Sequence, residues 1–271
     1  MKQSVFMTVV IVVSLVVSAI IFYYVFGSEV NFKTPERHVP ANLMGAVFLG
    51  GPIVVVLMAL SIMVITFTIE RQLSLSKAKG RGPIENFLKK VQNSLLEGNI
   101  DEAIGECDKQ RGSIANILKQ GLERFQVLSA DNKLEAEEKL QEVQSAIEEA
   151  MMLEVPLLER NLVVLSTIAS VSVLIGLFGT VVGMIRAFQA LAAAGTPNAA
   201  ELSSGISEAL INTAGGLFGA IVGTISYNYF VTKVGNITYM IDEATYNMLQ
   251  ILSIKGKRQH SFFKKTFNIV Y

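Results

Sequence analysis

The sequence predicts an all-α membrane protein with four transmembrane helices and a helical domain outside the bilayer. Of its 271 residues, 51% are hydrophobic and only 17% are charged, whereas a soluble domain typically carries about 25% charged residues. The mean hydropathy is +0.46. Four apolar segments account for this bias, and most of the charges fall in one stretch between the second and third.

The first apolar segment, Val5–Phe26, contains no charged residue. At a rise of about 1.5 Å per residue it is long enough to cross a hydrocarbon core of about 30 Å. The alternative is a cleaved signal peptide, but the apolar region of such a peptide usually has about 7 to 15 residues, and no small-residue cleavage site follows here. We therefore expect a retained transmembrane helix followed by a polar periplasmic loop, together residues 1–42.

Three further transmembrane helices are expected, at residues 43–69, 162–185 and 209–231. Residues 70–161 hold 13 of the 23 Lys and Arg residues and 17 of the 23 Asp and Glu residues, which predicts a solvent-exposed helical domain. Within it, apolar residues recur every three to four positions over residues 133–153, as in one long helix. The last two spans with their connection form a predicted channel core at 162–231, and residues 232–271 form a tail.

The distribution of positive charge sets the expected orientation, because Lys and Arg accumulate on the cytoplasmic side of a membrane protein. Cations cluster after the second span and in the tail, whereas the two outer segments carry only Lys33, Arg37 and Arg186. The cations of these two clusters are Arg71, Lys77, Lys79, Arg81, Lys233, Lys255, Lys257, Arg258, Lys264 and Lys265. Both termini, including Lys2, are therefore expected in the cytoplasm.

Several functional classes are excluded by residue content. A single cysteine, Cys107, cannot form an intramolecular disulfide, and with His38 and His260 it is too scattered for a metal site. No Ser/His/Asp set or phosphate-binding loop is present. We expect no catalytic residue, no cofactor, no metal and no nucleic-acid partner.

The middles of the four predicted spans contain no Asp, Glu, Lys, Arg or His. Ionisable residues in a membrane helix are the usual markers of an ion pathway, because burying a charge in lipid is costly. If the protein conducts protons, the titrating group is therefore either Glu208, at the mouth of the fourth span, or a residue of another chain.

Small residues are concentrated in the last two spans. Glycines repeat there at four-residue spacing, which permits close helix approach and by itself mostly indicates packing. The glycines expected to pack helices are Gly176, Gly179, Gly183, Gly215, Gly219 and Gly223.

At 100° per residue, the fourth span has two polar stripes. One holds Glu208, Asn212, Gly215, Gly219 and Ser226, and the other holds Thr213, Ala220, Thr224 and Tyr227. We expect one stripe to meet a neighbouring helix and the other to face a lumen or a partner. Thr180 and Thr213 lie at similar depth, so their hydroxyls either form part of a polar ring or bond back to their own helices.

Two long motifs resemble the MotA/TolQ/ExbB proton channel family, and within it the ExbB and TolQ proteins most. Residues 165–184, containing Gly176-Leu177-Phe178-Gly179-Thr180, look like the second core helix of that family. Residues 205–217, containing Glu208-Ala209-Leu210-Ile211-Asn212-Thr213, resemble the third, and Ala59-Leu60-Ser61 followed by Glu70-Arg71 resembles the end of the first.

The resemblance implies three family-core helices, to which Val5–Phe26 adds a fourth, peripheral one. It implies a pentameric ring in the bacterial inner membrane, around two copies of a single-span partner of the ExbD/TolR/MotB type whose Asp carries the proton. Thr180, Thr213 and Glu208 match the family's polar pathway, to which we add Asn212. In the ExbB branch, the complex energises outer-membrane import through a TonB-like protein.

Alternatives remain open at this stage. The powered machine could be of the Tol, gliding or flagellar type, and the transported ion could be sodium. A non-conducting membrane scaffold, in which the glycines only pack helices, is the competing class. The sequence also lacks prolines that the family often has in its last two core helices, with Val173 and Val222 or Gly223 instead.

Overall fold

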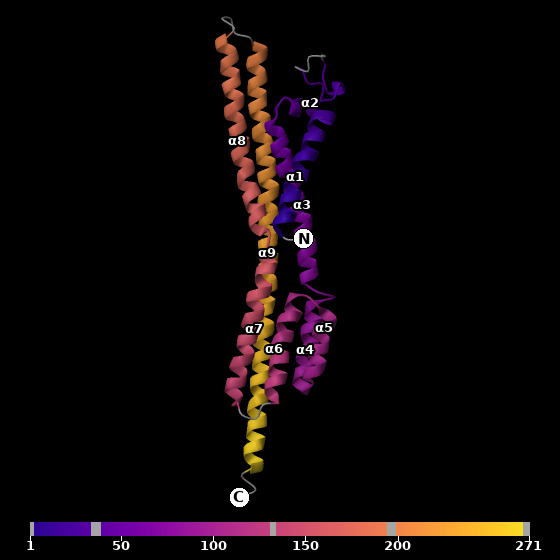
Figure 1. Cartoon of the computed structure of the whole chain (residues 1–271), viewed down its shortest axis with the longest axis vertical. Coiled ribbons are helices and arrows are strands. Elements are labelled where there is room, and N and C mark those ends of the chain that lie inside the picture. The colour runs from indigo at the N-terminus through magenta and orange to yellow at the C-terminus, as the bar shows by residue number, and fades with distance from the viewer. Residues whose placement is uncertain (1–2, 34–38, 131–133, 194–198, 268–271) are drawn as a thin grey trace. The chain divides into compact units, whose positions relative to one another are not determined.

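A computed structural model describes residues 3–33, 39–130, 134–193 and 199–267 (Figure 1). Of the described residues, 89% are helical, and none of them forms a β-strand. They divide into two compact units, one of Met1–Arg71 with Asn161–Phe230 and one of Gln72–Arg160 with Val231–Tyr271. Lys2 and Arg37, used in the orientation argument, lie outside the described residues, as do the side chains of residues 255–271.

The first unit contains every long apolar helix. In chain order its elements are α1 (Gln3–Ile20), the π-helical turn η1 (Ile21–Phe26), the 3-10 turn η2 (Glu29–Asn31), α2 (Leu43–Phe48), α3 (Ile53–Ala78), α8 (Leu162–Ala193) and the first part of α9 (Ala199–Phe267). Among the described residues, four helices are long and apolar enough to cross a membrane, which confirms the predicted all-α membrane class.

The prediction of one helix over residues 43–69 is wrong, because the helix is interrupted between α2 and α3. Gly51 has a φ of +73°, a value that side chains with a Cβ rarely adopt, and Pro52 has no backbone N–H to donate. The apolar pattern could not reveal this interruption, since hydropathy reports burial in lipid and not backbone continuity. α8 and α9 also extend into the connection expected at residues 186–208, and α9 continues through most of the expected tail.

Two asparagines hold the turn between η1 and α2. The buried Asn31 donates its side-chain amide to the carbonyls of Val25 and Phe26, at 2.6 and 3.1 Å. Asn42 donates to the Asn31 side-chain oxygen at 2.9 Å and caps α2 by accepting from the Gly45 N–H at 3.0 Å. The two side chains thus satisfy backbone groups at both helix ends, which would otherwise lack partners.

Helix α1 and the following turn η1 pack through a narrow stripe of Ser14, Ser18 and Phe22, all buried. The ring of Phe22 stacks on Phe48 with centroids 4.8 Å apart, and Phe6 meets Phe67 edge-on at 6.1 Å. Most other residues between Val5 and Ile20 are apolar and exposed, as expected of a helix in contact with lipid.

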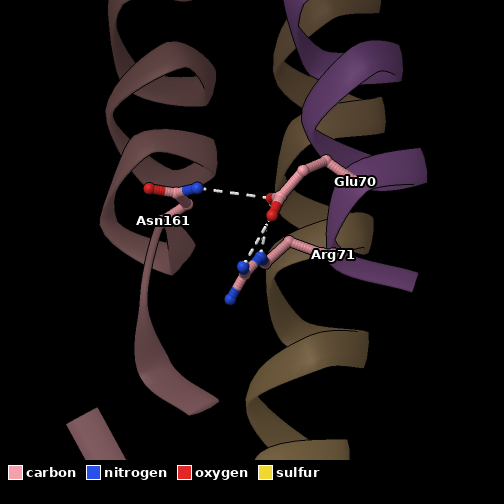
Figure 2. A network of polar contacts seen from close by, with 3 residues as sticks. All are labelled: Glu70, Arg71 and Asn161. Atoms are coloured by element: carbon pink, nitrogen blue, oxygen red, sulfur yellow. Dashed lines mark hydrogen bonds and ion pairs between the residues drawn. The ribbon is translucent and has the colours of Figure 1, made fainter. Parts of the chain in front are cut away.

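A buried polar cluster lies where α3 and the start of α8 meet in the first unit (Figure 2). Arg71, which is 1% exposed, donates through Nε and Nη2 to the two carboxylate oxygens of Glu70, at 2.9 and 2.8 Å. Asn161 donates to the same carboxylate at 3.3 Å and has a φ of +62°. Glu70 is half-buried and Arg71 is buried, and a charge removed from water needs such hydrogen bonds because desolvating it is costly.

The second unit is a helical bundle of α4 (Ile84–Glu97), α5 (Ile100–Gln110), α6 (Ser113–Ser129) and α7 (Ala136–Glu159), with the end of α3 and the rest of α9. Its core includes Ile117, Leu122, Val143 and Ile237. The helix expected over residues 133–153 corresponds to α7, which begins after a capping box formed by Glu135 and Glu138.

The only cysteine provides a test of this bundle. Burial raises the pKa of the Cys107 thiol to about 12, and the nearby Asp108 carboxylate adds to the shift. Since the thiolate is the reactive form, we expect maleimide labelling of the folded protein at pH 8 to be about a thousandfold slower than that of the denatured chain. Intact-mass spectrometry measures both rates, and rapid labelling of folded protein would contradict the packing described for α5.

Candidate functional site

Helices α8 and α9 run antiparallel and touch along a row of small residues (Figure 1). Successive contacts join Ala169 to Gly223, Ser172 to Gly219, Gly176 to Gly216, Gly179 to Asn212, Gly183 to Ala209 and Ala187 to Gly205. A Cβ placed on Gly216 would lie 2.6 Å from the Ser172 carbonyl oxygen, and one on Gly176 would lie 3.0 Å from Gly216 Cα. The two backbones are therefore in direct contact.

Thr180 and Thr213 are brought to one level by this register. Each follows a member of the Gly179–Asn212 contact by one residue, so the two lie within about 3 Å of each other in depth. In an antiparallel pair of right-handed helices, a step of one residue beyond the contact line leads to the same side on both helices. Both threonines therefore lie on one side of the α8–α9 pair, and both are half-buried.

The two hydroxyls bond to their own helices. Thr180 donates to the Leu177 carbonyl at 2.5 Å, and Thr213 donates to the Ala209 carbonyl at 3.1 Å. This is the back-bonding that threonine commonly adopts in a helix, and it leaves each oxygen with lone pairs to accept a further hydrogen bond.

The other polar stripe of α9 lies against α8 and against α3 with the segment that precedes it. A Cβ on Gly215 would lie 3.3 Å from Leu57, and the Asn212 amide donates to the Gly50 carbonyl at 2.9 Å. Asn212, which was expected at a position on the pathway, is fully buried. It lies inside the subunit and not on the side of Thr213. Because α3 lies on the opposite side of α9 from Thr213, α3 does not cover the side that carries the two threonines.

Glu208 is buried and forms an ion pair with Arg186. Its carboxylate also lies against Gly51, where a Cβ would come within 2.8 Å of Oε1. The sequence reading missed the role of Arg186, treating it only as an outer cation. An antiparallel pairing of the two glycine-rich helices would have revealed it, because that register brings residues 186 and 208 to one level.

Sequence analysis also missed Ser172, which is 1% exposed in the α8–α9 contact. Its hydroxyl and the Asn212 side-chain oxygen are buried without a hydrogen-bond partner among the described residues. Among those residues, no group of three or more His, Cys, Asp or Glu could hold a metal ion. The site is thus built from hydroxyls, amides, backbone carbonyls and a single ion pair.

These features define a multi-pass membrane protein with a glycine-packed helix pair that presents two level hydroxyls on one side. A family model described as the MotA/TolQ/ExbB proton channel family matches residues 109–243, and so covers α8 and most of α9 but neither α1 nor α3.

Relatives of this chain include proteins named TolQ and proteins named ExbB. The Tol-Pal system protein TolQ of Haemophilus influenzae is 36% identical over 157 residues, 56% of this chain and 67% of the relative. TolQ of Pseudomonas aeruginosa is 36% identical over 120 residues, 44% of this chain and 52% of the relative. The biopolymer transport protein ExbB of Salmonella typhimurium is 37% identical over 89 residues, 33% of this chain and 36% of the relative. The chain belongs to the MotA/TolQ/ExbB proton channel family.

The close approach of α8 and α9 can be tested by comparing two variants, each with alanine in place of one glycine of α9. Gly216→Ala forces the helices apart, because its Cβ would lie 2.6 Å from a backbone oxygen. Gly235→Ala is the matched control, since a Cβ there meets nothing within 4 Å. In circular-dichroism titrations with a denaturing detergent, we expect Gly216→Ala to destabilise the protein by about 1 to 3 kcal/mol.

Gly235→Ala should leave stability unchanged or raise it by up to about 1 kcal/mol, the helix-propensity gain of alanine over glycine. Equal stability of the two variants would contradict direct backbone contact at Gly216.

Proposed function

We propose that this chain is the channel-forming subunit of an energising complex of the TolQ/ExbB type, placed in a bacterial inner membrane with both termini in the cytoplasm. The observation that carries the proposal is the pair Thr180 and Thr213, level with each other on the side of α8 and α9 that α3 leaves uncovered. A surface with hydroxyls at this position suits a polar lumen, because each hydroxyl oxygen can still accept a hydrogen bond, for which lipid offers no donor.

The proton carrier is proposed to lie on a second chain. Glu208 is the buried carboxylate nearest the threonines in sequence, and its charge is already paired with Arg186. A single-span partner of the ExbD or TolR type would supply the titrating Asp. Five copies of this chain around two such partners would place five Thr180–Thr213 pairs around the acids. The chain itself would perform no catalysis.

Between the two branches, we propose ExbB-like energising of outer-membrane transport through a TonB-like protein, with TolQ-like envelope maintenance as the second candidate. The ExbB reading follows the motifs of α8 and α9. The TolQ reading is favoured by the longer alignments to the relatives of that name, 157 and 120 residues against 89.

The lumen-facing role predicts the effect of removing single hydroxyls. Thr180→Val and Thr213→Val keep the side-chain shape but lose the acceptor, so each should reduce energy-dependent uptake through a cognate outer-membrane transporter at least about tenfold, the effect of losing one proton-relaying group. Thr167→Val is the control, because Thr167 is an exposed α8 residue that bonds back to Val163.

Envelope integrity, scored as detergent resistance, is measured in the same strains to separate the two branches. Unchanged uptake and unchanged detergent resistance in the Thr180 and Thr213 variants, with normal assembly, would remove these residues from the pathway.

Assembly is tested by native mass spectrometry of the complex extracted with its membrane partners. A five-to-two complex with a single-span, Asp-bearing protein is expected. A homodimer alone would favour the scaffold class, in which the glycines serve packing only.

A further inference from the structure

The interruption between α2 and α3 meets α9 at two places, through one hydrogen bond and one close approach. Asn212 donates its side-chain amide to the Gly50 carbonyl at 2.9 Å, a bond that is buried. One turn earlier on α9, the Glu208 carboxylate lies against Gly51 and pairs with Arg186 of α8. The same short segment is therefore held at two successive turns of one helix.

The Gly50 carbonyl needs such a donor. Where a helix is interrupted, backbone groups lose their helical partners, and in a membrane no bulk water replaces them. Gly51 must remain without a side chain, both because its φ is +73° and because a Cβ would crowd Glu208 Oε1 at 2.8 Å. The interruption is thus shaped to receive these two side chains of α9.

Asn212 also contacts α8. Its Cβ and amide group fill the space that a side chain on Gly179 would occupy. One buried asparagine therefore joins the interruption of α3, the glycine row of α8 and the body of α9, so rotation of α9 about its axis would break all of these contacts.

We infer that Asn212 is a positioning residue that sets the rotation of α9, with the Arg186–Glu208 pair as a second tie, so that Thr213 lies on the side away from α3. Thr213 follows Asn212 at 100° around the helix. Neither Asn212 nor Arg186 contacts the transported ion in this role. The effect on energy coupling rests on the function proposed above, whereas the effect on the placement of Thr213 does not.

The placement is measured with a spin label on Thr213→Cys in a Cys107→Ala background, using the full chain in its complex. Electron paramagnetic resonance reports the collision rate of the label with a water-soluble relaxation agent. Loss of one buried hydrogen bond shifts the balance between helix rotations by roughly tenfold, so we expect Asn212→Leu to change this rate severalfold. The matched control is Asn236→Leu, at an exposed position of the same helix, which should leave the rate unchanged.

An unchanged collision rate in folded Asn212→Leu protein would overturn the inference. If that variant does not fold, exchanging the charges of Arg186 and Glu208 tests whether ties to α9 set its rotation. The Arg186 side chain is 51% exposed and therefore tolerates substitution more readily. Arg186→Glu and Glu208→Arg should each shift the rate, and the double exchange should restore it to within about twofold, since it rebuilds the ion pair. Failure of the double exchange to restore the rate would count against the second tie.

The two proposals fail in different ways. If Thr213→Val leaves uptake and detergent resistance intact while Asn212→Leu still moves the label, the lumen role is lost and the positioning role stands. If Asn212→Leu lowers uptake without moving the label, the positioning role is overturned and the function is retained.

Discussion

The direct backbone contact between α8 and α9 is the interaction on which the first unit, with its long apolar helices, depends. Lipid gives no hydrophobic advantage to helix association, so the helices must gain their stability from close packing. Glycines at Gly176, Gly179, Gly183 and Gly216 allow this, and the resulting register sets the depth of every side chain on the pair. That register places Thr180 and Thr213 at one level and pairs Arg186 with Glu208. It also places Asn212 in the space beside Gly179.

The sequence was sufficient for the class of fold because four apolar stretches are a strong signal. It was also sufficient to separate α9 into two polar stripes, since a helix has a fixed angular step. It could not predict the interruption between α2 and α3, where Gly51 and Pro52 act on the backbone while the surrounding residues remain apolar. The apolar pattern also predicted only the lipid-crossing part of each helix, whereas α8 and α9 both continue beyond the predicted spans.

The candidate site was predicted in its residue types and only in part in its arrangement. Thr180 and Thr213 could be paired from their distances to the ends of the spans. The roles of Arg186 and Ser172 emerge only when α8 and α9 are paired antiparallel, a step that reading each helix by itself does not include. Asn212 illustrates the difference, since its polarity suggested a pathway whereas its neighbours place it within the subunit.

The hydrogen bond from Asn212 to the Gly50 carbonyl also links the two positions in the sequences of related proteins. A carbonyl freed within a membrane helix needs a donor, so a relative that keeps a Gly-Gly-Pro interruption but has an aliphatic residue in place of Asn212 must provide that donor from another position. A relative with an uninterrupted helix needs none. Residues 50–52 and residue 212 are therefore expected to change together across the family, although they lie far apart in the chain.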